Sequence, residues 1–293
     1  MLLLLLLGVL LGQLRALPER TADVLDTVLI RVSLPGLILA VVPGVEVDAE
    51  LLVPAVVAWA TLALTAVTMW LLARLARLDQ RTTGTLLLVV PLANTSFLGF
   101  PAVEALLGAD HLPAAVVYDQ LGTFLALATY GAVVAARYGG TTRPGVGDVA
   151  RRVVTFPPLV AMAVAVALIG VGVPGPVDAV ASQLGATVTP LAMLAVGLRL
   201  QLGPGDWRPG LLAGALTVRL LVAPAAVFGF ATALGASGVA WSTSVLESAM
   251  PPMVTASVLA SQAGLDGRLG ARLVGVGVLV SMATLPAWAW LIS

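Results

Sequence analysis

The sequence feature that most constrains the fold is a polar, proline-containing interruption inside a long apolar segment. Residues 82–107 are apolar and long enough to cross a bilayer, which takes about 20 helical residues. Yet the segment contains Pro91, the polar triplet Asn94-Thr95-Ser96, and Pro101. Each proline removes a backbone donor, and free polar groups are costly in lipid unless protein or water receives them. The pattern predicts a helix broken at membrane depth, which is typical of a transporter's binding site.

A second apolar segment, residues 241–262, is interrupted in the same way by Glu247-Ser248 and Pro251-Pro252. Aligning Asp110 with Asp266 gives an offset of 156 (266 minus 110), which brings residues 94–96 opposite residues 250–252. Interrupted segments at corresponding places in two halves are typical of an internally repeated carrier.

Composition places the chain in a membrane and excludes several other classes. The chain is 59% hydrophobic and 10% charged, whereas soluble proteins are about 45–50% apolar and about 25% charged. Its formal net charge is zero, so nothing indicates a nucleic-acid partner. With no cysteine and a single histidine, His111, we expect no disulfide and no metal site.

Hydropathy predicts ten transmembrane helices, at residues 1–14, 21–42, 51–73, 82–107, 113–136, 153–172, 178–198, 209–234, 239–262 and 270–291. The first is short, and a signal peptide is the alternative. We favour a transmembrane helix, because neither a basic start nor a small-residue cleavage pattern precedes Arg15.

The arginines predict the orientation of the chain in the cell membrane. All fifteen basic residues are arginine, and all except Arg31 and Arg219 fall in or beside the loops after the first, third, fifth, seventh and ninth helices. The alternate loops, at 43–50, 108–112 and 172–177 and at 235–238, contain none. Arginine-rich loops stay cytoplasmic, so both termini are predicted to lie outside.

The polar linker 139–152 divides the chain into residues 1–138 and 153–293, each with five predicted helices. Two halves with an odd number of helices enter the membrane from opposite sides, so the repeat is predicted to be inverted. A second correspondence supports it: Ser33-Leu34-Pro35 matches Val188-Thr189-Pro190 at an offset of 155 (190 minus 35).

Three motifs together resemble the bacterial branch of the auxin efflux carrier family, in the bile/arsenite/riboflavin transporter superfamily. They are Pro91-Leu92-Ala93-Asn94-Thr95-Ser96-Phe97-Leu98-Gly99-Phe100-Pro101, Tyr118-Asp119-Gln120-Leu121-Gly122 and Ser248-Ala249-Met250-Pro251-Pro252. The resemblance covers essentially the whole chain. It implies an all-α polytopic membrane protein of two inverted five-helix repeats, with broken helices 4 and 9 crossing at the midplane.

The resemblance also implies that the helices form two groups with different roles in transport. Helices 1, 2, 6 and 7 would form a scaffold, often a homodimer surface, and helices 3–5 and 8–10 a moving transport domain. Family substrates are organic anions: auxin in plants, and malate, malonate or similar carboxylates in bacteria. Plant members have an asparagine-proline pair at each break, whereas here Thr95 follows Asn94 and Met250 precedes Pro251, which disfavours auxin itself.

The predicted substrate-binding residues are Asn94, Thr95, Ser96, Arg219 and Ser248. The Asn94 carboxamide offers two donors and an acceptor, although it could serve only to cap the break. Amides at the start of the following half-helix favour anions, and a guanidinium grips carboxylates at two points. The helix-breaking residues, Pro91, Pro101, Pro251 and Pro252, would act through exposed backbone.

Glu247, Asp119 and Gln120 are the candidates for coupling or charge compensation. An acid at membrane depth is a functional hypothesis, and Glu247 could hold a transported proton. The alternatives are that Glu247 pairs with Arg219 and that Asp119 is an interfacial acid bound to the preceding loop.

Two charged residues within predicted helices have structural interpretations. Glu104 is expected to extend outward to the interface. Arg31 is expected to extend toward the cytoplasm or to pair with Asp26.

These observations predict a secondary carrier for small organic anions that works by alternating access. No phosphate loop or nucleophile motif indicates an enzyme or a cofactor, so protons, sodium or the membrane potential would drive it. One alternative is a sodium- or proton-coupled cation antiporter of the same fold. Another is a non-transporting channel or membrane sensor, and a sensor would need a soluble output domain. A third is an intramembrane enzyme, which would need a nucleophile–base pair.

Overall fold

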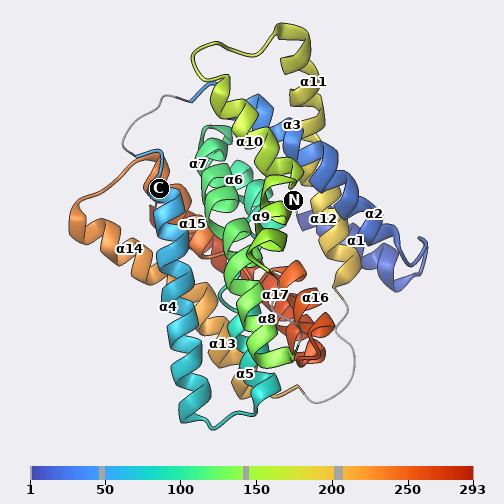
Figure 1. The fold of residues 1–293 in the computed structure, drawn as a ribbon, viewed down its shortest axis with the longest axis vertical. Helices are drawn as coiled ribbons and strands as arrows, with labels where there is room; N and C mark the ends of the chain where they lie inside the picture. Colours follow the sequence, from blue (N-terminus) through green and yellow to red (C-terminus); the bar gives the residue numbers. More distant parts are fainter. Residues whose placement is uncertain (1, 46–49, 141–144, 201–206, 293) are drawn as a thin grey trace.

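The computed structural model describes residues 2–45, 50–140, 145–200 and 207–292, and these residues fold almost entirely into helices (Figure 1). The first half comprises α1 (Leu2–Gln13), α2 (Thr21–Val28), η1 (Leu29–Ser33), α3 (Leu34–Val41), α4 (Val53–Leu75), α5 (Gln80–Val89), η2 (Thr95–Gly99), α6 (Phe100–Leu106), η3 (Ala109–His111), α7 (Leu112–Val117), η4 (Tyr118–Phe124), η5 (Leu127–Gly131) and α8 (Ala132–Gly139). The second half comprises α9 (Val146–Val154), α10 (Pro157–Ala167), α11 (Gly175–Ala186), α12 (Val188–Arg199), α13 (Pro209–Thr217), η6 (Val218–Val222), α14 (Ala223–Leu234), α15 (Val239–Ser248), α16 (Val254–Gln262) and α17 (Gly267–Ile292).

Each of the ten segments predicted from hydropathy contains helix. Six are long and apolar enough to cross a membrane: 21–41, 53–75, 109–139, 175–199, 209–234 and 267–292. The remaining four are the short helices α1 and α10 and the two interrupted segments, α5 to α6 and α15 to α16. The structure is therefore that of an all-helical, multi-pass membrane protein.

One group of helices packs around α12. Helix α1 lies along α12, and the α2–α3 rod contacts α10, α11 and α12. The approach is close because the contacts are made by glycines: a Cβ built on Gly8 would lie 2.6 Å from the Leu194 carbonyl oxygen. Small residues that let backbones approach are a usual basis of helix packing in lipid.

The other helices pack around the two interrupted segments. Helix α4 contacts η4 and α15, α5 contacts α8 and α16, and α16 packs on α17. The two groups touch through α12, which contacts η2 and α6, through α3, which contacts α7, and through α10, which contacts η4. The interrupted segments are thus enclosed, and residues 86–90 and 92–93 are at most 6% exposed.

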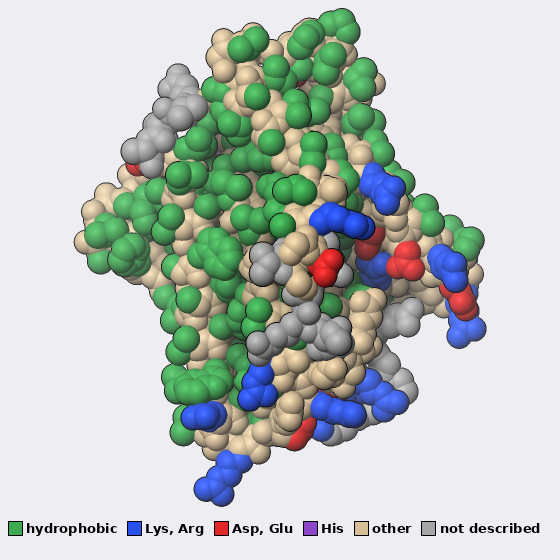
Figure 2. All heavy atoms as spheres, in the orientation of Figure 1, with side chains coloured by type: hydrophobic (Ala, Val, Ile, Leu, Met, Phe, Trp, Pro, Cys, Tyr) green, Lys and Arg blue, Asp and Glu red, His purple; other side chains and the backbone are tan. Residues whose placement is uncertain are grey.

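The charged side chains are unevenly distributed over the surface. Figure 2 shows arginines on the lower and right parts of the visible face, whereas hydrophobic side chains predominate over its left and upper parts. The exposed apolar side chains include Trp59, Val67 and Leu71 of α4 and Leu3 of α1. Such a band, bordered by arginines, is what a lipid-facing surface requires.

The structure differs from the sequence-based expectations at two places outside the interrupted segments. The predicted linker is helical from Val146, where α9 begins, and its residues 141–144, with Arg143, lie outside the described part. Asp26 pairs with the guanidinium of Arg199 and not with Arg31. The same guanidinium also binds Asp23, at 2.5 Å. Arg31 is exposed.

Glu104 is exposed, as expected, and its carboxylate accepts a hydrogen bond from the Thr189 hydroxyl at 3.1 Å. This bond joins α6 to α12.

Candidate substrate site at the helix crossing

The two interrupted segments meet at their breaks and pair through their backbones. The Asn94 amide donates to the Pro251 carbonyl oxygen at 2.8 Å, and the Met253 amide donates to the Leu92 carbonyl oxygen at 2.8 Å. Ala93 and Pro252 form an isolated antiparallel bridge. Each break therefore satisfies backbone groups that the other leaves open, as an interruption in lipid requires.

The prolines differ in their contribution to the breaks. Pro91, Pro251 and Pro252 lie in the non-helical stretches. Pro101 was predicted to break the helix but does not, because it lies in the first turn of α6, directly after the π-helix η2. A proline is tolerated within a membrane helix where a local π-helical adjustment satisfies the freed backbone groups.

The hydroxyls after the first break are held by Asp119. The Thr95 and Ser96 hydroxyls donate to Asp119 Oδ1 at 2.5 and 2.6 Å, and Gln120 Nε2 donates to Asp119 Oδ2 at 2.6 Å. Asp119 is 1% exposed and Gln120 is wholly buried. The acid is therefore a buried partner of the break and not an interfacial acid bound to the preceding loop.

Arg219 joins both breaks through carbonyl oxygens. Its Nε donates to Met250 O at 2.8 Å and its Nη2 to Ser248 O at 2.9 Å, and Nη1 lies 3.5 Å from Pro91 O. The side chain is 1% exposed. In this conformation the guanidinium organises the crossing, and its N–H donors are bound to backbone carbonyl oxygens.

Ser248 and Glu247 end α15 beside the second break. The Ser248 hydroxyl donates to Val245 O of its own helix at 2.7 Å. Glu247 is 0% exposed, and neither carboxyl oxygen has a hydrogen-bond partner, so it forms no hydrogen-bonded pair with Arg219. Electrostatic interactions nonetheless connect Glu247 with both Arg219 and Asp119.

Gly99 makes room for the Glu247 carboxyl. A Cβ built on Gly99 would lie 2.5 Å from Glu247 Oε2 and 2.7 Å from Oε1, closer than any side-chain contact allows. The glycine in the predicted motif therefore places the backbone of one broken helix against the acid of the other.

Several polar groups at the crossing keep unused hydrogen-bonding capacity. Among the described residues, buried Asn94 Nδ2, Gln120 Oε1 and both Glu247 oxygens have no partner. Two half-helices, Thr95 to Leu106 and α16, also begin here, and the first amides of a helix lack intrahelical acceptors. The crossing thus offers donors, acceptors and buried charge to a small polar ligand.

The sequence-predicted candidates gather at this crossing, but three connections were not predicted. Asp119 was predicted to be a coupling residue or an interfacial acid, and its bond with Thr95 was not predicted. The ring of His111 lies within hydrogen-bonding distance of the Thr243 hydroxyl (Nδ1–Oγ1 2.8 Å). The Ser33 and Thr187 hydroxyls lie 2.7 Å apart, so the matched motif of the first half begins beside the residue that precedes its counterpart.

Several of the candidates share one local signal, which is a π-helical turn. Thr95, Asp119 and Arg219 lie in η2, η4 and η6. Such turns frequently occur at functional sites. At η2 the Gly99 amide bonds the Asn94 carbonyl oxygen five residues back, which is the bond that defines a π-helical turn.

A hollow of about 600 Å³ opens between α3 and the starts of α4, α7 and α15. It is lined by residues from two of the arginine-free connections, including Glu50 and Asp110. Its position defines an arginine-poor end of the molecule, opposite the turns that carry Arg81, Arg208 and Arg268.

Fold and site together define a polytopic helical membrane protein whose two broken helices cross at a buried polar centre. The chain matches the family described as membrane transport protein over residues 1–289, and it belongs to that family. This confirms the resemblance to the auxin efflux carriers.

Two archaeal proteins are similar along almost their whole length. An uncharacterized transporter of Methanothermobacter thermautotrophicus is 30% identical, over 98% of this chain and 95% of its own. An uncharacterized transporter of Methanocaldococcus jannaschii is 26% identical, over 94% of this chain and 91% of its own.

Proposed function

We propose that the protein is a secondary carrier for small organic anions, such as dicarboxylates of the malate or malonate type, and that the crossing is its substrate site. The observation that carries the proposal is the start of two half-helices at the paired breaks, beside the unpartnered Asn94 Nδ2. Half-helix N-termini near the midplane attract anionic substrate groups.

The charges at the crossing support coupling to a proton or cation. Arg219 contributes one positive charge, while Asp119 and Glu247 are two buried acids. An isolated buried carboxylate is costly unless paired. Glu247, which has no hydrogen-bond donor, would therefore carry a proton in this conformation, and losing it would change the net charge that a substrate meets.

The packing supports transport by alternating access within two inverted repeats. Helices α1 to α3 and α10 to α12 would form the scaffold and the homodimer surface, and α4 to α8 with α13 to α17 would move. The arginine-free loops would face outward with both termini, and the hollow between α3 and α4 would be the outer approach.

The proposal is tested by uptake of labelled mono- and dicarboxylates into proteoliposomes, with and without an imposed pH gradient. We expect saturable flux that Asn94→Ala lowers roughly tenfold or more, since a hydrogen bond to a charged group contributes about 1.5–3 kcal/mol. Thr65→Ala is the matched control, because Thr65 is equally buried but bonds only within α4.

One observation favours a second candidate function, a cation antiporter. Two acids, Asp119 and Glu247, are buried at the crossing, whereas the guanidinium there is bound to carbonyl oxygens. If the proteoliposomes move no carboxylate but exchange sodium for protons, and Asp119→Asn abolishes that exchange, the anion proposal is wrong and the antiporter replaces it.

A further inference from the structure

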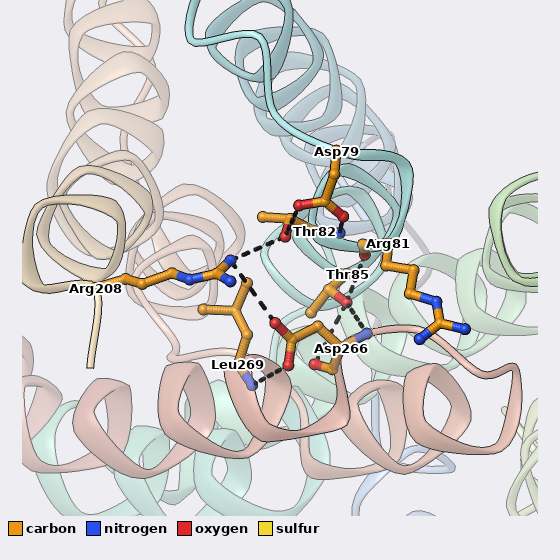
Figure 3. A network of polar contacts seen from close by, with 7 residues as sticks. All are labelled: Asp79, Arg81, Thr82, Thr85, Arg208, Asp266 and Leu269. Atoms are coloured by element: carbon orange, nitrogen blue, oxygen red, sulfur yellow. Dashed lines mark hydrogen bonds and ion pairs between the residues drawn. The ribbon is translucent and has the colours of Figure 1, made fainter. Parts of the chain in front are cut away.

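A charged hollow lies at the arginine-rich end, where three connections meet. It has a volume of about 360 Å³ and is lined by Arg81, Arg208 and Arg268 together with Asp79 and Asp266. Both aspartates already serve as helix caps: Asp79 accepts from the Thr82 amide, and Asp266 from the Leu269 amide. Figure 3 shows these bonds and the Arg208 side chain reaching between the two turns.

An apolar groove of about 380 Å³ begins beside this hollow and runs between α13–η6 and α17. Its lining includes Trp207 and Pro209, the neighbours of Arg208, so the two spaces adjoin at one stretch of chain. Almost all of the groove is apolar, with Leu212, Leu216 and Leu221 on one wall, as a hydrocarbon chain requires.

One ridge of α17 connects the two spaces. Arg268 lines the charged hollow, Arg272 lies over the Trp207 ring (5.3 Å to its centroid), and Val276, Val280 and Thr284 line the groove. Residues four apart form a continuous ridge along a helix. At 1.5 Å per residue, Arg272 to Thr284 spans about 18 Å, close to the roughly 15 Å of one hydrocarbon leaflet.

We propose that this combined surface is a specific binding site for a bilayer phospholipid with an anionic headgroup. The headgroup phosphate would lie in the charged hollow beside Arg268, and one acyl chain would lie in the groove. Three arginines against two capped aspartates leave the hollow positive, and arginines near a membrane surface attract anionic lipids. A lipid in the groove would hold α13 against α17.

The test uses the purified full-length protein in mild detergent, with bound lipid counted by native mass spectrometry. Phosphatidylglycerol is compared with phosphatidylcholine of the same acyl chains and with soluble glycerol phosphate. We expect phosphatidylglycerol to be retained preferentially, with Arg268→Gln lowering its affinity about fivefold. Ala213→Phe, which fills the groove from an exposed position, should also lower it.

The controls are Arg20→Gln and Ala225→Phe, which make the same changes at exposed positions outside the hollow and the groove. Both should bind lipid as the parent protein does. Equal retention of the two lipids, or variants that match their controls, would overturn the proposal. Binding of glycerol phosphate alone with equal affinity would replace it with a site for small anions. The readout is lipid binding, so it does not depend on the transported substrate.

Discussion

Gly99 and Glu247 form a close contact between the two halves of the crossing. The glycine belongs to η2 and the acid to α15, and only a hydrogen at the glycine position leaves space for the carboxyl group. A single methyl group here therefore tests whether the two breaks meet as the structure shows.

We expect Gly99→Ala to destabilise the protein by about 1–3 kcal/mol, the usual cost of overpacking. The measurement is thermal unfolding in detergent. Gly229→Ala is the control, because nothing lies within 4 Å of a Cβ built there. In a Glu247→Ala background the added methyl group should cost much less, since contacting residues are energetically coupled. Equal costs in both backgrounds would contradict the contact.

Glu247 itself makes a prediction about coupling. Glu247→Gln keeps the shape of the side chain but cannot exchange a proton. We expect the variant to fold as stably as the parent, because neither carboxyl oxygen has a donor to lose. Carboxylate flux should lose its response to an imposed pH gradient. Flux that responds to the gradient as before would exclude Glu247 as the proton carrier.

At the scale of elements, Arg219 holds the two interrupted segments together. It reaches from η6 to carbonyl oxygens that helix ends leave without donors of their own. Three segments distant in sequence, near residues 91, 219 and 250, thus depend on one side chain.

Arg219→Met should lower the free energy of unfolding by about 3–5 kcal/mol, because it leaves buried carbonyl oxygens unpaired. The midpoint of thermal unfolding should fall accordingly. Arg219→Lys should recover only part of this loss, since an ammonium lacks the planar fork. Arg31→Met is the control, because Arg31 is exposed. If Arg219→Met and the control unfold at the same midpoint temperature, Arg219 does not organise the crossing.

The cap of α5 makes a prediction about pH. The Thr82 hydroxyl and amide donate to Asp79 and hold the pKa of its carboxyl below the usual 3.8. The charged form is therefore favoured in the folded state, so its stabilisation is present above pH 3.8 and is lost as pH falls through the lowered pKa.

Asp79→Ala should cost about 0.5–2 kcal/mol near neutral pH, as loss of an N-cap does. The difference from the parent protein should shrink below pH 3.8. Thermal unfolding from pH 7 to pH 3 measures it, and a pH-independent difference would contradict the cap.

At the scale of the whole molecule, the sequence predicted the helical segments better than their contacts. Apolar length and the prolines predicted both interruptions, because backbone satisfaction in lipid is a local requirement. The Asp119–Thr95 bond and the Arg219 clamp could not be predicted, because each joins segments whose distance depends on packing. The π-helical turns were missed because hydropathy is insensitive to one extra residue per turn.

The two-group packing predicts that movement between α6 and α12 is needed for transport. A short thiol crosslinker between Glu104→Cys and Thr189→Cys, which replace a bonded pair, should stop flux until it is cleaved. The same treatment of Asp23→Cys and Arg199→Cys, an accessible bonded pair within the proposed scaffold, should leave flux intact. Inhibition by both pairs, or by neither, would contradict the division into scaffold and moving helices.

The central claim, that the crossing is reached in turn from both sides of the membrane, is tested most directly by labelling Ser96→Cys. The chain contains no cysteine, so this thiol is the only target. In proteoliposomes, an impermeant maleimide should label it from either side, and transported substrate should slow the labelling. Buried Thr65→Cys should remain unlabelled. Active transport with Ser96→Cys unreactive from both sides would contradict the account.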